Sequence, residues 1–310
     1  MPPSEAEGFG DRLAGLVAAR ASQIVLGLDP DPAQLWPAAL ASAGPPGPPP
    51  AERAARAVAV HCRLAIEAAG EQCVAVKLQV ACFERLGAPG WAALAAVVQS
   101  ARAAGLLVIA DAKRGDIGVT AAAYAQAFLG ETPTPFGTVT GLGVDALTVN
   151  PLLGIDSIEP FVVAARAGGA GLLILVRTSN PGAADIQELA LASSCAVSDV
   201  LADIVSELGA PGIGAAGLSD IGAVVGATAP GRLAALRARM PHTVFLLPGV
   251  GAQGARVEDL VPAFEPGPAG GLIAASRGIV NAYRQAGGEP AAAARAEAAR
   301  LRELAWSLAT

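Results

Sequence analysis

The sequence predicts a (β/α)8 barrel, a closed ring of eight parallel strands in which a helix follows each strand. Eight short apolar runs recur along the 310 residues, and Ala-rich helical stretches separate them. The runs are continuous in Val, Ile and Leu rather than alternating, which is typical of parallel strands buried on both faces. Eight alternations of strand and helix favour a closed barrel, and a doubly wound open sheet is the alternative.

The elements follow in order from these patterns. The strands are expected at 24–29, 73–78, 106–111, 144–149, 171–176, 221–228, 243–249 and 271–276. The helices between them are expected at 51–69, 90–104, 119–129, 156–168, 185–208, 230–239 and 256–264. A helix at 9–20 precedes the first strand, and 289–308 is expected to be a closing helix with Glu and Arg on its solvent side. The Pro-rich stretches 44–50 and 129–139 are expected to be stiff loops. Residues 1–310 are therefore expected to form one barrel domain with an extra helix at each end.

Composition narrows the class of protein. The chain is 53% hydrophobic and 15% charged, which suits a large core. No apolar run approaches the roughly 18 residues that cross a membrane, and no secretory signal is recognisable, so we expect a cytoplasmic protein without membrane association. The net charge of −6, with no basic cluster, argues against nucleic acid as a partner.

Cysteine and histidine spacing gives no metal site. The two histidines fall in a predicted helix and beside a proline, where a structural role is expected. The four cysteines contain no C-x-x-C pair and are expected to be free, buried thiols: Cys62, Cys73, Cys82 and Cys195.

The stretch VIADAKRGDIGVT (108–120) places three charges at the end of an apolar run. Residues two apart in a strand share a face, so Asp111 and Lys113 project together if the strand reaches that far, and Asp116 falls in the turn that follows. Charges so close together are costly to desolvate, and such groups usually serve chemistry at a strand end. The stretch therefore predicts a functional site.

Lysine is rare in this chain, and both lysines occupy strand ends. Of 21 basic residues only Lys77 and Lys113 are lysine, and the rest are arginine. Arginine effectively never releases its proton, whereas lysine can. The two positions where lysine remains are therefore candidates for proton transfer.

Polar residues follow most of the predicted strands. In a (β/α)8 barrel the carboxyl ends of the strands surround one mouth, where active sites lie. These positions hold Asp29, Lys77, Asp111, Lys113, Asp116, Asn150, the segment 177–182 and Arg277. The charges are expected to converge on one site.

Two segments match the glycine pattern G-x-G-x-x-G, at 212–217 and 249–254. Neither lies in the first strand–helix turn, as a dinucleotide-binding fold requires, so we expect chance matches in a Gly-rich chain. The second segment follows the seventh strand, where backbone amides in barrels often cradle a phosphate. Arg277 would supply the charge.

These residues carry a family resemblance. DAKRGDIGVT resembles the D-x-K-x-x-D-I signature of orotidine 5′-monophosphate decarboxylases, especially a subgroup of longer bacterial enzymes, type 2. The likeness continues through LGLDPDP (26–32), VKLQVACFERLG (76–87), TVNPLLGIDSIEPF (148–161), RTSNPGA (177–183), PGVGAQG (248–254) and SRGI (276–279). The chain departs from the family pattern at Leu78 and at Leu152–Leu153, and neither departure affects a position with a charged role.

The resemblance implies a cofactor-free carboxy-lyase that converts orotidine 5′-monophosphate (OMP) to uridine 5′-monophosphate (UMP) and CO2 in pyrimidine biosynthesis. Loss of CO2 at C6 leaves a carbanion without simple delocalisation, so several effects must add to lower the barrier. In similar enzymes an array of alternating charge, here Lys77, Asp111, Lys113 and Asp116, lies beside the scissile carboxylate. Asp111 would disfavour the substrate carboxylate, and Lys113 would stabilise the carbanion and protonate C6.

The resemblance also implies substrate contacts. Asp29 and Lys77 would bind ribose hydroxyls, Ser179 the pyrimidine amide edge, and Gln253 with Arg277 the phosphate. The full implied set is Asp29, Ile117, Thr120, Asn150, Ser179, Pro248, Gly251, Gln253 and Arg277. Family members complete their site across a homodimer interface, so Asp116, Ile117 and Thr120 are expected to reach the partner's site.

Two other functions remain open. Related barrels that act on sugar phosphates, such as 3-keto-gulonate 6-phosphate decarboxylases and hexulose phosphate synthases, share D-x-K-x-x-D but use magnesium and extra acidic ligands near the second strand. Here the nearest acidic residue after Lys77 is Glu84, seven residues on, which weakens that case. A non-catalytic nucleotide sensor is the third possibility, but a binder would gain nothing from Asp111 repelling its ligand.

Overall fold

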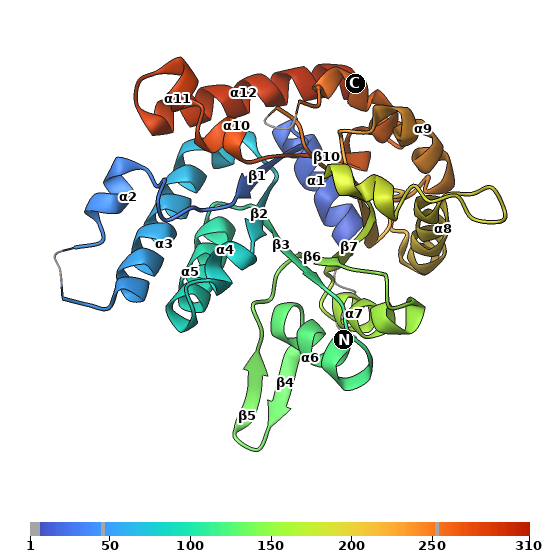
Figure 1. The fold of residues 1–310 in the computed structure, drawn as a ribbon, viewed down its shortest axis with the longest axis horizontal. Helices are drawn as coiled ribbons and strands as arrows, with labels where there is room; N and C mark the ends of the chain where they lie inside the picture. Colours follow the sequence, from blue (N-terminus) through green and yellow to red (C-terminus); the bar gives the residue numbers. More distant parts are fainter. Residues whose placement is uncertain (1–6, 45–46, 252–253) are drawn as a thin grey trace.

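The computed structural model is a closed (β/α)8 barrel, as the sequence predicts (Figure 1). It describes residues 7–44, 47–251 and 254–310. All eight strands of the ring run parallel, in the order β1-β10-β9-β8-β7-β6-β3-β2. They are β1 (Ile24–Leu28), β2 (Ala75–Gln79), β3 (Leu107–Arg114), β6 (Ala146–Val149), β7 (Gly171–Arg177), β8 (Ile221–Val225), β9 (Phe245–Pro248) and β10 (Gly271–Ala275).

Most helices surround this ring, α1 closes one of its ends, and the two terminal helices are where the sequence places them. The longer helices are α1 (Phe9–Arg20), α3 (Pro50–Ala69), α5 (Ala88–Ala103), α6 (Gly118–Phe128), α7 (Ile155–Ala167), α8 (Val197–Gly209), α9 (Pro230–Arg239) and α12 (Pro290–Ala309). Short α-helices are α2 (Pro37–Ala41), α4 (Ala81–Glu84), α10 (Arg277–Val280) and α11 (Tyr283–Ala286). Short 3-10 helices are η1 (Gly70–Gln72), η2 (Pro181–Asp185), η3 (Ala210–Gly212), η4 (Val257–Phe264) and η5 (Pro268–Gly270). No helix among the described residues has the length and apolar character needed to span a membrane.

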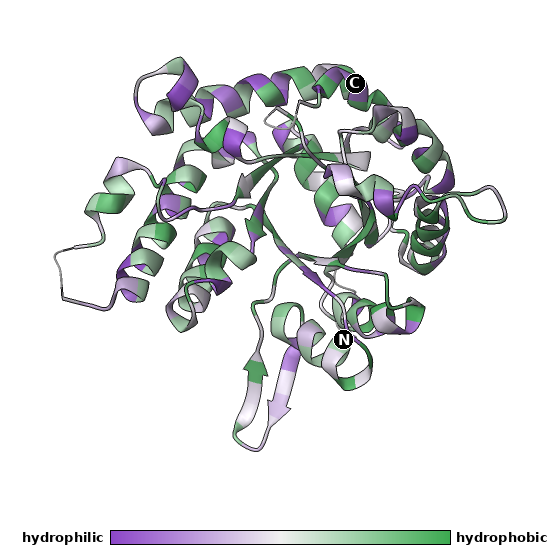
Figure 2. Cartoon of the chain, in the orientation of Figure 1, coloured by the Kyte–Doolittle hydropathy of each residue, from purple (hydrophilic) through white to green (hydrophobic). Residues whose placement is uncertain are grey.

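Side-chain alternation along the strands divides the core into two layers and sets the direction of the site residues. Ile24, Leu26 and Leu28 of β1 belong to the apolar layer between strands and helices, whereas Val25 belongs to a smaller cluster inside the ring. In Figure 2 the strands of the ring are mostly hydrophobic, and the surrounding helices are of mixed hydropathy. On β2 and β3 the inward set includes Ala75 and Ile109. The same alternation turns Lys77 and Asp111, two residues further along, into the barrel.

The end of the barrel opposite the site is closed by α1. Phe9, Leu13 and Val17 of this helix belong to the inner cluster. The carboxylate of Asp11 accepts hydrogen bonds from the backbone N–H groups of Ala215 and Ala216, at 3.1 and 2.7 Å. The glycine pattern at 212–217 therefore binds a carboxylate of the chain itself.

Two predicted helices differ from the structure. The prediction of a helix over 185–208 is wrong in its first half, because α8 begins only at Val197, where the Asp199 carboxylate accepts the Ala196 N–H at 2.8 Å. The preceding loop is held to the end of β7 by Glu188, which pairs with Arg177 at 2.6 Å. The predicted helix at 256–264 is the 3-10 helix η4, which contains Pro262.

The prediction that 129–139 is only a stiff loop is also wrong. This segment forms an antiparallel hairpin of β4 (Glu131–Thr134) and β5 (Gly137–Thr140), which projects from the barrel wall (Figure 1). Both strands are edges, so Pro133 removes no necessary ladder bond. The turn is closed by the Thr134 hydroxyl, which donates to the Gly137 carbonyl at 2.6 Å.

The cysteines are free thiols, as expected. Cys62 and Cys73 are buried, whereas Cys82 and Cys195 are only partly buried. In the other Pro-rich stretch, 44–50, residues 45–46 lie outside the described residues and Pro50 begins α3.

Candidate active site

A cavity of about 360 Å³ opens at the carboxyl ends of the strands. Strand-end residues from β1, β2, β3, β7, β9 and β10 line it, and Val224, Leu246 and Ala274 form its apolar floor. The sequence-predicted residues that line it are Asp29, Lys77, Asp111, Lys113, Ser179, Pro248 and Arg277. The structure therefore brings most of the predicted site residues to one place.

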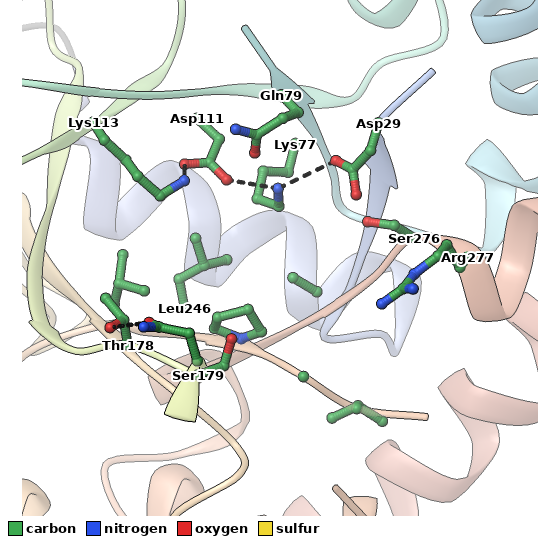
Figure 3. A pocket seen from close by; sticks show the side chains of 16 residues that line it. Asp29, Lys77, Gln79, Asp111, Lys113, Thr178, Ser179, Leu246, Ser276 and Arg277 are labelled. Carbon is green, nitrogen blue, oxygen red and sulfur yellow. Dashed lines mark hydrogen bonds and ion pairs between the residues drawn. The ribbon is translucent and has the colours of Figure 1, made fainter. Parts of the chain in front are cut away.

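Three of the predicted charges form a continuous ion-paired row (Figure 3). Lys77 Nζ lies 2.7 Å from Asp111 Oδ2, and Lys113 Nζ lies 2.5 Å from Asp111 Oδ1. Asp29 Oδ1 lies 3.7 Å from Lys77 Nζ on the other side. Asp111 is thus clamped between two ammonium groups at the cavity wall.

An irregularity in β3 shapes this row. The register between β3 and β6 shifts between Ala110 and Arg114, so β3 holds extra residues there. Within this bulge Lys113 has φ +49°, a left-handed conformation that is uncommon for a residue with a side chain. The bulge leaves the Lys113 side chain 44% exposed at the cavity, whereas that of Lys77 is 8% exposed. Bulges beside active sites commonly re-aim a side chain in this way.

Ion pairing outweighs the effect of burial on the pKa values of Asp111 and Lys77. Burial by itself raises the pKa of Asp111, but Lys77 and Lys113 outweigh it and lower that pKa to about 2. Burial likewise opposes the charge on Lys77, but Asp111 and Asp29 raise the pKa of Lys77 above its ordinary value. Both groups are therefore charged at neutral pH.

Acidification is expected to remove the stability that Asp111 contributes. Its folded-state pKa of about 2 lies below the ordinary 3.8, so the contribution is present above about pH 4 and is lost as pH falls towards about 2. The shift corresponds to about 2 kcal/mol in the free energy of unfolding. Urea unfolding of wild type and Asp111→Asn at about pH 6 and about pH 2.5 would measure it. The difference between the two proteins should shrink at the lower pH, and a constant difference would contradict this account.

Arg277 lies at the other end of the cavity from Lys113 (Figure 3). It is the first residue of α10 and is separated from β10 only by Ser276, and the glycines of the loop after β9 approach the same region. Gly249 and Gly251 have φ of +112° and +74°, conformations that glycine adopts without strain. A guanidinium beside a Gly-rich loop is suited to an anionic group such as a phosphate. Gln253, predicted to share this role, lies outside the described residues.

Ser179 reaches the cavity on the loop after β7. Its carbonyl accepts a hydrogen bond from the Thr228 hydroxyl at 3.0 Å. The loop packs directly on Gly226, where a Cβ would lie 2.7 Å from the Ser179 Cα. The loop position thus depends on a glycine at the end of β8.

Five predicted site residues do not line this cavity in the single chain. Asn150 turns its Oδ1 to the backbone N–H of Leu152, at 3.1 Å. Asp116 accepts the N–H of Ile117 at 2.8 Å, and Ile117 and Thr120 are exposed where α6 begins. Gly251 lines a neighbouring hollow that also contains Arg277.

Sequence reasoning did not single out Gln79 or Ser276, and both line the cavity. Gln79 shares the inward face of β2 with Lys77, so strand alternation could have indicated it. Ser276 occupies the space beside Gly27, where a Cβ would lie 1.8 Å from the Ser276 Oγ. Gly27 therefore makes room for this serine, a relation that no local pattern reveals.

The first acidic residue after the second strand, Glu84, pairs with an arginine outside the cavity. This arginine is Arg114, and Glu84 itself does not line the cavity. Across the parts of the chain that the structure describes, no group of three or more His, Cys, Asp or Glu side chains is placed to hold a metal ion.

Fold and site together define a (β/α)8-barrel enzyme with a Lys–Asp–Lys row at one end of its cavity and an arginine at the other. The family model for orotidine 5′-phosphate decarboxylase / HUMPS matches residues 22–296. The chain belongs to this family.

Named relatives agree with the family match. An orotidine 5′-phosphate decarboxylase of Deinococcus radiodurans is 48% identical over 215 residues, which cover 69% of this chain and 74% of the relative. An orotidine 5′-phosphate decarboxylase of Salinispora arenicola is 39% identical over 300 residues, which cover 95% of this chain and 96% of the relative. The structure of Leishmania donovani OMP decarboxylase superposes with a TM-score of 0.73 at 31% identity, covering 97% of this chain and 98% of that one.

Proposed function

We propose that this chain decarboxylates OMP to UMP and CO2 in de novo pyrimidine biosynthesis, in the cytoplasm and without a cofactor. The observation that carries the proposal is the Lys77–Asp111–Lys113 row beside a cavity that ends at Arg277. In a nucleotide the phosphate and the pyrimidine lie at opposite ends of the ribose. A substrate whose phosphate binds Arg277 would therefore direct its base towards Lys113.

Each charge then has a part in the reaction. Asp111, ionised because its pKa is about 2, would lie against the carboxylate at C6 and disfavour it in the bound substrate. As CO2 leaves, the negative charge moves to C6, where the Lys113 ammonium stabilises the carbanion and then delivers its proton. Lys77 holds Asp111 from the buried side at 2.7 Å and, with Asp29, would bind ribose hydroxyls.

The remaining binding roles follow from position. Ser179 would contact the pyrimidine amide edge from the loop after β7, and Arg277 the phosphate, with Pro248 and Gly251 on the adjoining loop. Phosphate binding energy can be used to close loops and align the reacting carbon.

We infer further that the active form is a homodimer in which Asp116, Ile117 and Thr120 complete the partner's site. These residues follow β3, which pairs directly with β6. Large apolar side chains are exposed just after both strands: Ile117 (58%), Val119 (88%), Leu152 (59%) and Leu153 (55%). Such a patch supports an interface at this edge of the mouth.

Mixing two inactive variants is expected to restore activity if Asp116 acts across the interface. Lys113→Ala and Asp116→Ala are each expected to be inactive as homodimers. After unfolding and refolding together, a mixed dimer has one site with both residues native, which gives about a quarter of wild-type activity for random pairing. Each variant refolded alone is the control. No recovery in a mixture shown to contain mixed dimers would place Asp116 in its own subunit's site.

The proposed reaction is tested by the loss of OMP absorbance on adding purified protein in excess chelator. Turnover to UMP that is unaffected by chelation is expected. Absence of OMP turnover, with activity on a sugar phosphate when magnesium is restored, would overturn the proposal in favour of the other branch of the family.

A further inference from the structure

A buried threonine on β6 hydrogen-bonds both to the Asp111 carboxylate and to the backbone of Lys113. Thr148 has no exposed surface. Its hydroxyl donates to Asp111 Oδ1 at 3.0 Å and accepts the backbone N–H of Lys113 at 2.9 Å. Asp111 Oδ1 is also the oxygen that accepts the Lys113 ammonium at 2.5 Å. One hydroxyl thus binds both the carboxylate and the backbone of the lysine that pairs with it.

The β3 bulge explains why this hydroxyl is needed. Between the paired residues Ala110 and Arg114, β3 has three residues, whereas β6 has only Thr148 between their partners Leu147 and Val149. The Lys113 N–H therefore has no carbonyl opposite it in a regular ladder, and a buried N–H left unpaired is costly. A hydroxyl can accept this bond and donate another at the same time.

We propose that Thr148 is a positioning residue for decarboxylation, which holds Lys113 in its left-handed conformation and fixes the Asp111 carboxylate against it. This role rests on the proposed function. Thr148 does not line the cavity, so it acts through Lys113 and Asp111 and not on the substrate. Its loss is therefore expected to lower kcat and to leave KM for OMP nearly unchanged.

Three variants test this role. Thr148→Val keeps the shape of the side chain and removes the hydroxyl. Its kcat is expected to fall about 10- to 100-fold, and its KM for OMP to stay within about twofold of the wild-type value. Thr148→Ser keeps the hydroxyl and should recover kcat to within about threefold of wild type. Thr243→Val is the matched control, because Thr243 is also buried, 2% exposed, but lies ahead of β9 at the amino end of the barrel. It should leave kcat unchanged.

The readouts separate positioning from packing. If Thr148→Val only lowers the melting temperature and its folded form retains wild-type kcat, the inference is overturned while wild-type turnover still supports the proposed function. Absence of turnover in wild type would overturn both. Should the valine variant not fold, Thr148→Cys and Thr148→Ser form a second pair, in which the only difference is a thiol in place of a hydroxyl. A kcat for the cysteine variant well below that of the serine variant supports the role, because a thiol is a weak donor and acceptor, and equal kcat values refute it.

Discussion

Replacement of Lys113 with alanine is expected to lower kcat for OMP decarboxylation by at least about 10⁴-fold. The substitution removes both the cation that faces the developing charge and the acid that protonates C6, and each effect is typically worth about 10² or more. The side chain is 44% exposed, so its removal leaves no cavity in the core and the protein should remain folded. The measurement is kcat for OMP, with the thermal melt as a check on folding.

Lys113→Arg is the informative companion to the alanine variant. Arginine keeps the positive charge beside Asp111 but does not release a proton at neutral pH. If proton delivery is essential, the arginine variant should remain severely impaired. Arginine activity close to that of wild type would show that charge alone suffices and would contradict the assignment of Lys113 as the acid.

Asp111→Asn is expected to lower kcat by at least about 10³-fold, on the scale of losing one strong preorganised electrostatic group. The neutral amide cannot disfavour the substrate carboxylate and no longer holds the two ammonium groups. Affinity for UMP, which has no carboxylate at C6, should change far less than kcat. Parallel measurement of OMP turnover and UMP binding tests this split.

Asp220→Asn provides the matched control for Asp111→Asn. Both aspartates are 7% exposed and ion-paired, but Asp220 pairs with Arg166 at the amino end of β8, away from the cavity. Its replacement should reduce stability without the loss in kcat. Equal losses of kcat in the two variants would indicate that both act only through stability.

Strand alternation made the inner part of the site predictable. Lys77 and Asp111 point into the barrel because side chains alternate along a strand, and these two lie two residues beyond the inward-facing Ala75 and Ile109. The expectation that Asp111 and Lys113 project together is confirmed. They do so because β3 has a bulge in which Lys113 adopts a left-handed conformation, and not because the strand continues regularly. A bulge depends on the pairing with β6, which no local sequence pattern contains.

Other features depend on contacts between distant segments. The hairpin at 131–140 has no buried face, so it lacks the apolar alternation that reveals a strand. The late start of α8 follows from the Asp199 cap and from the loop contacts of Glu188 with Arg177. Thr148 is an ordinary strand residue in sequence, and its role becomes visible only when β3 lies beside it.

Decarboxylation with proton delivery to C6 can be followed by proton NMR of OMP incubated with the purified protein in D2O, with chelator present. We expect stoichiometric UMP whose C5 proton is a singlet, because Lys113, exchanged with solvent, delivers a deuteron to C6. OMP that persists unchanged beside folded protein, or a product other than UMP, would contradict this expectation.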